Sequence, residues 1–307
     1  MKEQINHLMS FYDSYLQGKK NVIKLVLLSL ISQGHILIED VPGLGKTTLA
    51  LVIAKSLGLS FGRVQSTNDM LPSDITGLSI YDKNIESFKF HPGPIFNNIV
   101  LVDEINRATP KTQSALLEAM GEKQVTVDGV THQLPDPFFV IATQNPSEHY
   151  GINPLPESQL DRFIMKTSIG YPSRHEELNI LTTGSLKNNI SGIAPVLNSE
   201  QINTMVSHVH NNIYLSNKIK DYILNIAAAT RLNPLVETGL STRGILSVAD
   251  IAKASAFLAD RDFIIPEDIT DYAHNTITHR LIFKNSPSEE HRKEIVKSTI
   301  ASIPQPV

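Results

Sequence analysis

A glycine-rich turn between an apolar strand and an amphipathic helix most constrains what this chain can fold into. Residues 35–38 are typical of a short buried strand, and residues 48–57 carry apolar side chains at helical spacing. The turn and the first helical residues between them are Asp40, Val41, Pro42, Gly43, Leu44, Gly45, Lys46, Thr47 and Thr48. A strand, a glycine-rich turn and a helix in this order form a phosphate cradle.

The chemistry of such a cradle assigns roles to individual residues. Backbone N–H groups and the positive end of the helix face the β- and γ-phosphates of a nucleotide, Lys46 reaches them, and the Thr47 hydroxyl ligates Mg²⁺. Asp40 occupies the first position of the pattern, where the strict form has glycine. Aspartate tolerates left-handed backbone better than most residues, so we still expect the turn. An ordinary helix start with a Pro-Gly turn would explain the glycines but not Lys46 and Thr47.

Two acids directly follow a second apolar strand, residues 99–102. Ligands of open α/β sheets bind at the carboxyl ends of strands, which is where Asp103 and Glu104 stand. We expect Asp103 to hold Mg²⁺ through water and Glu104 to orient and polarise the attacking water. The alternative is an acidic pair that caps the helix beginning near residues 108–110.

Three further polar residues are candidates for the same chemistry. Asn145 follows a third apolar strand, residues 138–142, and could touch both the γ-phosphate and the water; a plain turn before Pro146 is the alternative. Arg162, near the end of the α/β region, could complete a neighbouring subunit's site or form a surface ion pair. Arg243 begins a helix and could fold back on the γ-phosphate of its own subunit.

The order of patterns along the chain predicts its organisation. Apolar strands that alternate with helices indicate a parallel sheet covered on both faces. Residues 124–133 alternate around Asp128 and Gly129, a strong hairpin signal, and residues 78–90 predict a looser hairpin. From about residue 200 the pattern is almost wholly helical. We predict an α/β core over residues 1–171, a linker over 172–197, a small all-helical lid domain over 198–283 and a tail over 284–307.

Composition narrows the class of protein. Of the 307 residues, 41% are apolar and 19% charged, which is typical of a globular protein in water. The net charge of −4 argues against general affinity for nucleic acid. Because there is no cysteine, disulfides, thiolate zinc sites and a cysteine nucleophile are excluded. The most apolar run, residues 22–38, is too polar to span a bilayer, so we expect a cytoplasmic protein without membrane insertion.

Several long strings resemble the MoxR family of AAA+ ATPases, and the likeness runs from about residue 15 to about residue 283. They read IEDVPGLGKTTLA, LPSDITG, HPGPIF, VDEINRATPKTQSALLEAMGEKQVTVDG, FFVIATQNP and PLPESQLDRF, followed by a stretch over residues 260–268. The resemblance implies an αβα P-loop core with two β-hairpin inserts and a lid.

The resemblance also implies roles for the candidate residues, with ATP and Mg²⁺ as the ligands. Residues 40–48 correspond to Walker A, and Leu16 and Gly18 to the adenine pocket. The remaining correspondences are Asp103 and Glu104 for Walker B, Asn145 for sensor 1, Arg162 for the arginine finger and Arg243 for sensor 2.

At the level of assembly, the resemblance implies a homo-oligomeric ring, usually hexameric, with ATP between subunits. In this family the ATPase cycle serves chaperone-like maturation or metal-cofactor insertion, often of proteins with a von Willebrand factor A domain. This chain has no such domain, so its partner must be another polypeptide. Two alternatives remain open: a nucleic-acid-remodelling ring such as a helicase loader, and a nucleotide switch that hydrolyses ATP weakly.

Overall fold

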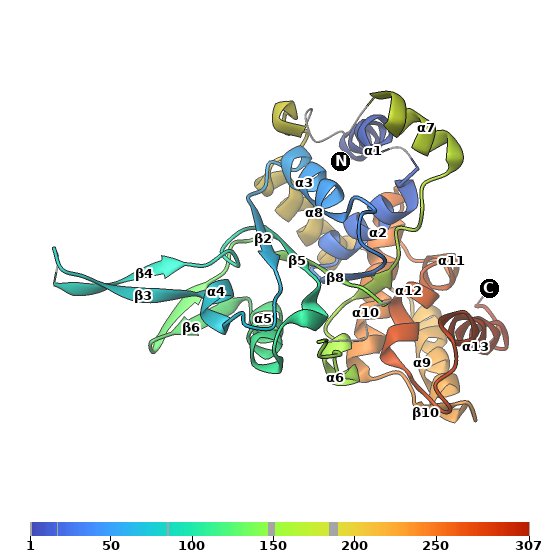
Figure 1. Ribbon diagram of the computed structural model, residues 1–307. Coiled ribbons are helices and arrows are strands. Elements are labelled where there is room, and N and C mark those ends of the chain that lie inside the picture. The colour runs from blue at the N-terminus through green and yellow to red at the C-terminus, as the bar shows by residue number, and fades with distance from the viewer. Residues whose placement is uncertain (1, 17, 85, 147–150, 184–189, 307) are drawn as a thin grey trace.

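A five-stranded parallel sheet forms the centre of the amino-terminal part of the chain (Figure 1). The computed structural model describes residues 2–16, 18–84, 86–146, 151–183 and 190–306. The strand order is β2-β5-β8-β1-β9, and every pair of neighbours is parallel. The strands are β1 (Ile36–Glu39), β2 (Phe61–Gln65), β5 (Ile99–Asp103), β8 (Phe139–Gln144) and β9 (Met165–Thr167).

Helices cover both faces of this sheet, as the continuous apolar strands predict. Ile36 and Ile38 belong to one buried cluster with helices α2 (Lys20–Ile31) and α3 (Lys46–Ser56). Leu37, between them in sequence, belongs to the cluster on the opposite face with α5 (Pro110–Glu122). This alternation follows from the two-residue period of a strand. Helix α1 (Lys2–Tyr15) adds Leu8 and Tyr12 to the first cluster.

Two hairpins extend from the α5 side of the core. The first is β3 (Gly77–Asp82) with β4 (Ser87–Pro92), which projects far from the sheet in Figure 1. The second, β6 (Gln124–Val127) with β7 (Val130–Gln133), turns at Asp128 and Gly129, whose φ values of 51° and 79° suit a two-residue hairpin turn. The Phe90 ring stacks on His132 at 4.0 Å between centroids, so the hairpins pack together.

The carboxyl-terminal part is helical apart from a short antiparallel pair, β10 (Val236–Thr238) with β11 (Ile282–Phe283). This pair is a departure from the predicted all-helical lid. The long helices are α8 (Ser199–Asn212), α9 (Asn217–Leu232) and α10 (Thr242–Leu258). Shorter elements follow them: α11 (Glu267–Thr270), α12 (Ala273–Ile277) and the 3-10 turn η4 (Thr278–Arg280).

The segments predicted as a linker and a tail both contain helices. Residues 172–197 include α7 (Arg174–Thr183) and a 3-10 turn, η3 (Ile190–Gly192). Residues 284–307 include α13 (Glu289–Ala301), which Ser288 caps by accepting the His291 N–H. Ile295, Val296 and Ile300 are buried in the main core, so α13 is a packed part of the lid rather than a tail.

Smaller elements connect these parts: α4 (Pro72–Thr76), the 3-10 turn η1 (Ile105–Arg107) and α6 (Glu157–Leu160). Across the described ranges, no helix has the length and apolar character that crossing a membrane requires.

Candidate functional site

The phosphate loop leaves the carboxyl end of β1 and enters α3. Its left-handed residues are Gly43 (φ 88°) and Gly45 (φ 82°), and Gly45 is the residue before the helix. Asp40 is outside the positive-φ region, so the expected left-handed turn at Asp40 does not occur. The two glycines supply the turn, because glycine has no Cβ to oppose a positive φ. The amino end of α3, with Lys46 and Thr47, therefore faces the loop as a phosphate site requires.

Lys46 is the first residue of α3, and its side chain turns back to the start of the phosphate loop. Its Nζ donates a hydrogen bond to the Asp40 carbonyl oxygen at 2.5 Å. Partial burial lowers the pKa of Lys46, and the nearby carboxylates of Asp40, Asp103 and Glu104 oppose that shift. The fold thus brings the cradle and the acid pair together, although more than fifty residues separate them in sequence.

Both acids are held in defined positions at the end of β5. Asp103 is buried and pairs with Arg63 on β2, whose Nη2 lies 2.8 Å from Oδ2. Glu104 has left-handed backbone (φ 55°), and its N–H donates to Thr143 Oγ1 at 3.0 Å. The alternative of a helix cap is excluded for α5, because Thr109 Oγ1 accepts the Thr112 N–H there.

The Glu104 carboxylate is already engaged by two neighbours. Arg107 Nη1 donates to Oε2 at 3.0 Å, and Gln65 Nε2 approaches the same oxygen at 3.5 Å. Both partners are within the same chain. Glu104 is therefore held by side chains from β2 and η1 at the carboxyl end of the parallel strands, where the phosphate loop also lies.

Asn145 follows β8, and the strand order explains its position. Because β8 lies between β1 and β5, its carboxyl end separates the phosphate loop from Asp103 and Glu104. Asn145 is buried there, with 7% of its surface exposed. A side chain in this place can contact groups of both neighbouring strands, whereas a simple turn before Pro146 would not need burial.

The residues present suit Mg²⁺ bound together with a nucleotide. The candidate ligands are the Thr47 hydroxyl and the Asp103 carboxylate, which are hard oxygen donors. Mg²⁺ usually takes one or two protein oxygens and completes its octahedral shell with phosphate oxygens and water. Asp103 is buried at the carboxyl end of β5, which is the end of the sheet where the phosphate loop leaves β1.

Arg162 lies at the opposite end of the sheet from the phosphate loop of its own chain. It precedes β9, and β9 runs parallel to β1, whereas the loop follows β1. Its Nη1 donates to the Leu117 carbonyl oxygen at 2.8 Å, on α5. Because the two strands point the same way, Arg162 at the start of β9 is remote from Lys46, which follows the end of β1.

Arg243 is on the same side as Arg162. Its Nη1 lies 3.9 Å from Asp161 Oδ2, and its side chain is 56% exposed. Asp161 also accepts a hydrogen bond from Ser241 Oγ at 3.1 Å and pairs with Arg280 at 3.2 Å. Asp161 precedes β9, so these contacts place Arg243 beside the start of that strand.

The predicted adenine segment borders the phosphate loop. Leu16 is buried, and Gly18 has φ 72° and faces Glu176 of α7 so closely that a Cβ would lie 1.6 Å from its Oε1. Lys19, next in sequence, donates from Nζ to the Leu44 carbonyl oxygen at 2.6 Å. Burial lowers the pKa of Lys19, against the attraction of Glu176 and Asp40.

Sequence reasoning missed several residues that shape this site. Arg63 and Gln65 alternate on β2, a pattern of period two that predicts a shared face. Their relation to the acids depends on the strand order, which the sequence does not reveal. The sequence signal for Lys19 is weaker, namely that a lysine directly follows Gly18 of the predicted adenine segment.

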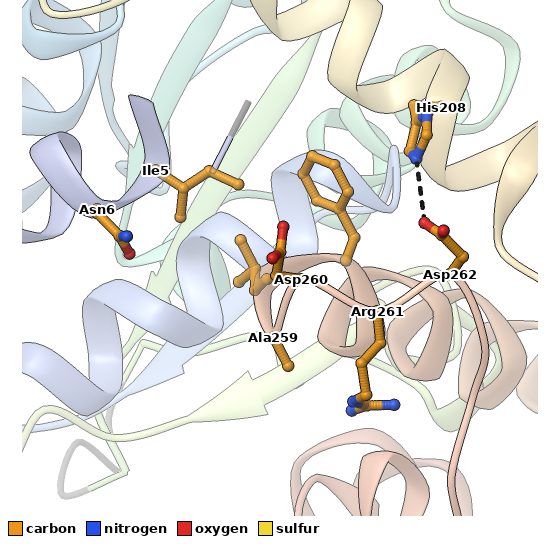
Figure 2. Close-up of a pocket in the computed structure, with 9 residues that line it drawn as sticks. Ile5, Asn6, His208, Ala259, Asp260, Arg261 and Asp262 are labelled. Carbon is orange, nitrogen blue, oxygen red and sulfur yellow. Dashed lines mark ion pairs between the residues drawn. The ribbon is translucent and has the colours of Figure 1, made fainter. Parts of the chain in front are cut away.

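A separate cavity lies away from these residues. It measures about 450 Å³ and is lined by α1, α8 and the end of α10 (Figure 2). Figure 2 shows His208 directed toward Asp262, and their closest atoms are 4.0 Å apart. None of the residues lining it belongs to the predicted nucleotide site, so the cavity is distinct from the phosphate loop.

Comparison with known proteins covers both parts of the chain. Residues 35–165 match the family described as "ATPase family associated with various cellular activities (AAA)", and residues 228–300 match the AAA lid domain. The lid match extends into α13, in agreement with the packing of that helix.

Individual relatives are similar over most of their length. Uncharacterized protein YeaC of Bacillus subtilis is 47% identical over 94% of this chain and 91% of that protein. Chaperone MoxR1 of Mycobacterium tuberculosis is 36% identical over 91% of this chain and 76% of its own length. A crystal structure from Cytophaga hutchinsonii, described as that of a "putative ATPase", has a TM-score of 0.92 and 34% identity, and the match covers 100% of this chain and 96% of that one.

Proposed function

The chain belongs to the MoxR family of AAA+ ATPases, and from this premise we propose that it hydrolyses ATP and uses the cycle to remodel a partner protein. One observation carries the proposal: the parallel strands β1, β8 and β5 bring Lys46 of the phosphate loop to the same end of the sheet as Asp103 and Glu104. A loop that only bound a nucleotide would not need an acid pair beside it. The two groups together provide phosphate binding and water activation.

Each residue has a defined part in the proposed reaction. Loop N–H groups and Lys46 hold the β- and γ-phosphates, and Thr47 and Asp103 would hold Mg²⁺. When bound, Mg²⁺ neutralises charge on the phosphate oxygens. Glu104 orients the attacking water, for which its carboxylate leaves Arg107. Asn145, between the two groups, contacts the γ-phosphate and the same water.

The site is completed by a neighbouring subunit. Arg162 cannot serve its own phosphate loop, because it lies at the other end of β9 from the loop. In a ring, Arg162 would leave the Leu117 carbonyl and contact the γ-phosphate bound to the adjacent chain. Arg243, linked to the same region through Asp161, would face that neighbour as well. This arrangement supports a homo-oligomeric ring, for which we propose six subunits.

The partner is proposed from the family. We propose that the ring acts as a chaperone in maturation or metal-cofactor insertion, on a separate protein that contains a von Willebrand factor A domain. One relative, Chaperone MoxR1, is a chaperone by name. We also propose a cytoplasmic location, which rests on composition.

Two variants test the reaction. Lys46→Ala should lose ATP binding, because the cradle loses its cation. Glu104→Gln should bind ATP normally while its kcat falls by at least about 100-fold, the range expected when a general base is removed. Isothermal titration and phosphate release measure the two properties. Near-normal turnover of Glu104→Gln would show that another group activates the water.

The same assay separates the alternatives. A nucleic-acid-remodelling ring would show ATPase activity that DNA stimulates and that salt strongly suppresses. A nucleotide switch would bind ATP tightly in the wild type and hydrolyse it no faster than Glu104→Gln. The partner role is tested by binding of a purified von Willebrand factor A domain protein to the Glu104→Gln ring with ATP and with ADP. Equal binding in both states would argue against a nucleotide-driven chaperone.

A further inference from the structure

The side chain of Asp40 holds the segment that follows the last strand of the core. Its Oδ2 accepts the backbone N–H of Ile169 at 2.7 Å and that of Gly170 at 2.8 Å. Both residues come after β9, which is the parallel neighbour of β1, whereas Asp40 comes directly after β1. Asp40 therefore joins the segments that leave two adjacent strands at the same edge of the sheet.

The rest of Asp40 is equally well fixed. Its N–H donates to the Gln144 carbonyl oxygen at 3.1 Å, which continues the pairing of β1 with β8. Its Oδ1 accepts the Val41 N–H at 3.0 Å, and its carbonyl oxygen accepts Lys46 Nζ at 2.5 Å. One residue thus contacts Lys46 through its main chain and residues 169 and 170 through its carboxylate.

Loop geometry does not explain why this residue is an aspartate. The strict form of the loop has glycine here, and Asp40 does not adopt the backbone region that favours glycine. What aspartate adds is a carboxylate, and hydrogen bonds from N–H groups to a carboxylate are stronger than those to neutral acceptors. The hydrogen bonds that its carboxylate accepts from the N–H groups of residues 169 and 170 therefore explain why residue 40 is an aspartate.

We propose that Asp40 is a positioning residue that couples occupancy of the phosphate loop to residues 168–173, here called the connecting segment. The connecting segment leads from β9 to α7, which precedes the lid helices in sequence. The coupling rests on the proposed function, since the occupant is a nucleoside triphosphate. Phosphate oxygens are stronger acceptors than a neutral carbonyl, so a triphosphate draws Lys46 Nζ away from Asp40. Loss of the hydrogen bond from Lys46 changes how Asp40 is held. This change alters the hydrogen bonds that Asp40 Oδ2 accepts from the N–H groups of Ile169 and Gly170.

Charges around the connecting segment support this coupling. Glu176, in the first turn of α7, accepts the Ser173 N–H through Oε2 at 2.6 Å. The same carboxylate attracts Lys19, which donates to Leu44 inside the phosphate loop. The connecting segment is thus joined to the loop through Asp40, and the negative charge of Glu176 attracts Lys19, which itself contacts the loop.

Amide hydrogen exchange of the full chain tests the contact and the coupling separately. Without nucleotide, Asp40→Gly should exchange the N–H groups of Ile169 and Gly170 at least about tenfold faster than wild type, since both lose a charged acceptor. Asp40→Asn should be intermediate, because its amide oxygen still accepts. Glu177→Gln, an exposed change on α7, is the matched control and should match wild type. Unchanged exchange in both Asp40 variants would overturn the contact.

The coupling is measured by adding Mg²⁺ and adenylyl imidodiphosphate. Wild type should change its exchange at residues 169 and 170, whereas Asp40→Gly should bind the analogue without that change and lose kcat more than it raises KM. Wild type that binds the analogue with no change at these residues would overturn the coupling. Failure of wild type to bind the analogue would instead contradict the proposed function, and the first measurement would still stand.

Discussion

Arg63 holds the carboxylate of Asp103 from the neighbouring strand, with Nε and Nη2 each 2.8 Å from Oδ2. Parallel pairing of β2 with β5 sets Gln65 opposite Asp103 and so brings Arg63, two residues earlier, to the same edge. The Arg63 guanidinium thus places a positive charge beside the Asp103 carboxylate, which we propose as a Mg²⁺ ligand. The pair is half open to solvent on the Arg63 side, which weakens it.

Replacing Arg63 should therefore ease Mg²⁺ binding. Arg63→Gln removes a positive charge that competes for Asp103, so the Mg²⁺ concentration for half-maximal ATPase activity should fall by about twofold to fivefold. A Mg²⁺ titration of phosphate release at saturating ATP measures it. Arg174→Gln, an exposed arginine on α7, serves as the control. A rise in the Mg²⁺ requirement would mean that Arg63 orients Asp103 rather than competing for it.

Two arginines share Asp161, and their burial predicts different effects on stability. Arg280 has 1% of its side chain exposed, pairs with Asp161 at 3.2 Å and donates to the Phe163 carbonyl oxygen at 2.6 Å. Burial lowers the pKa of Arg280 to about 10 although Asp161 opposes the shift. Arg280→Met should lower the free energy of unfolding by about 3 kcal/mol, because a buried pair is broken.

Arg243→Met is the matched variant on the same carboxylate. Arg243 is 56% exposed and 3.9 Å from Asp161, so its removal should change stability by less than about 0.5 kcal/mol. Urea denaturation of both variants provides the comparison. Equal losses of unfolding free energy in Arg280→Met and Arg243→Met would contradict the expectation that the buried arginine stabilises the protein more than the exposed one.

His35 predicts a loss of stability in mild acid. The Val140 N–H donates to Nδ1 at 3.0 Å, so Nε2 carries the proton and donates to the Met120 carbonyl oxygen at 3.1 Å. Burial is the main cause that lowers the pKa of His35 to about 4. As pH falls, His35 is therefore protonated in the unfolded chain before it is protonated in the folded chain. The contribution of neutral His35 to the free energy of unfolding is fully present above pH 6.5 and decreases by roughly 3 kcal/mol toward pH 4.

The variant His35→Gln isolates that contribution from other titrating groups such as His279, whose pKa burial also lowers. Its unfolding free energy should be lower at neutral pH and should depend less steeply on pH between 6.5 and 4. Denaturant titrations of the two proteins across this range measure the difference in slope. Parallel curves would show that His35 does not titrate on unfolding.

The central strands could be predicted because their burial is complete. Strands β5 and β8 pack on both faces, so each is a continuous apolar run, and the Asp128-Gly129 turn fixes the second hairpin. Strand β2 lies at the sheet edge with alternating exposure, Arg63 and Gln65 among its exposed residues, and gives no such run. Its place beside β5 depends on contacts that are distant in sequence.

The helices in the segments predicted as a linker and a tail, α7 and α13, were missed for different reasons. Helix α7 exposes Leu178 and Leu181, so its leucines do not mark a buried face. Helix α13 carries the apolar residues Ile295 and Ile300, but it begins after a loop that contains Pro287, a residue typical of turns. Among site residues, the loop and the acids follow from motifs. The contacts of Asp40, Arg162 and Arg243 follow from the direction of β9 relative to β1, which only the fold provides.

Mixing two inactive variants tests most directly whether each nucleotide site needs Arg162 from a neighbouring chain. Arg162→Ala should lose about 10³–10⁵ in kcat, as arginine fingers do, and Glu104→Gln should be inactive by itself. In mixed rings, an Arg162→Ala subunit keeps Glu104 and can receive Arg162 from a Glu104→Gln neighbour. We expect mixing to restore ATPase activity well above that of either variant alone. No recovery in rings shown to contain both subunits would contradict it.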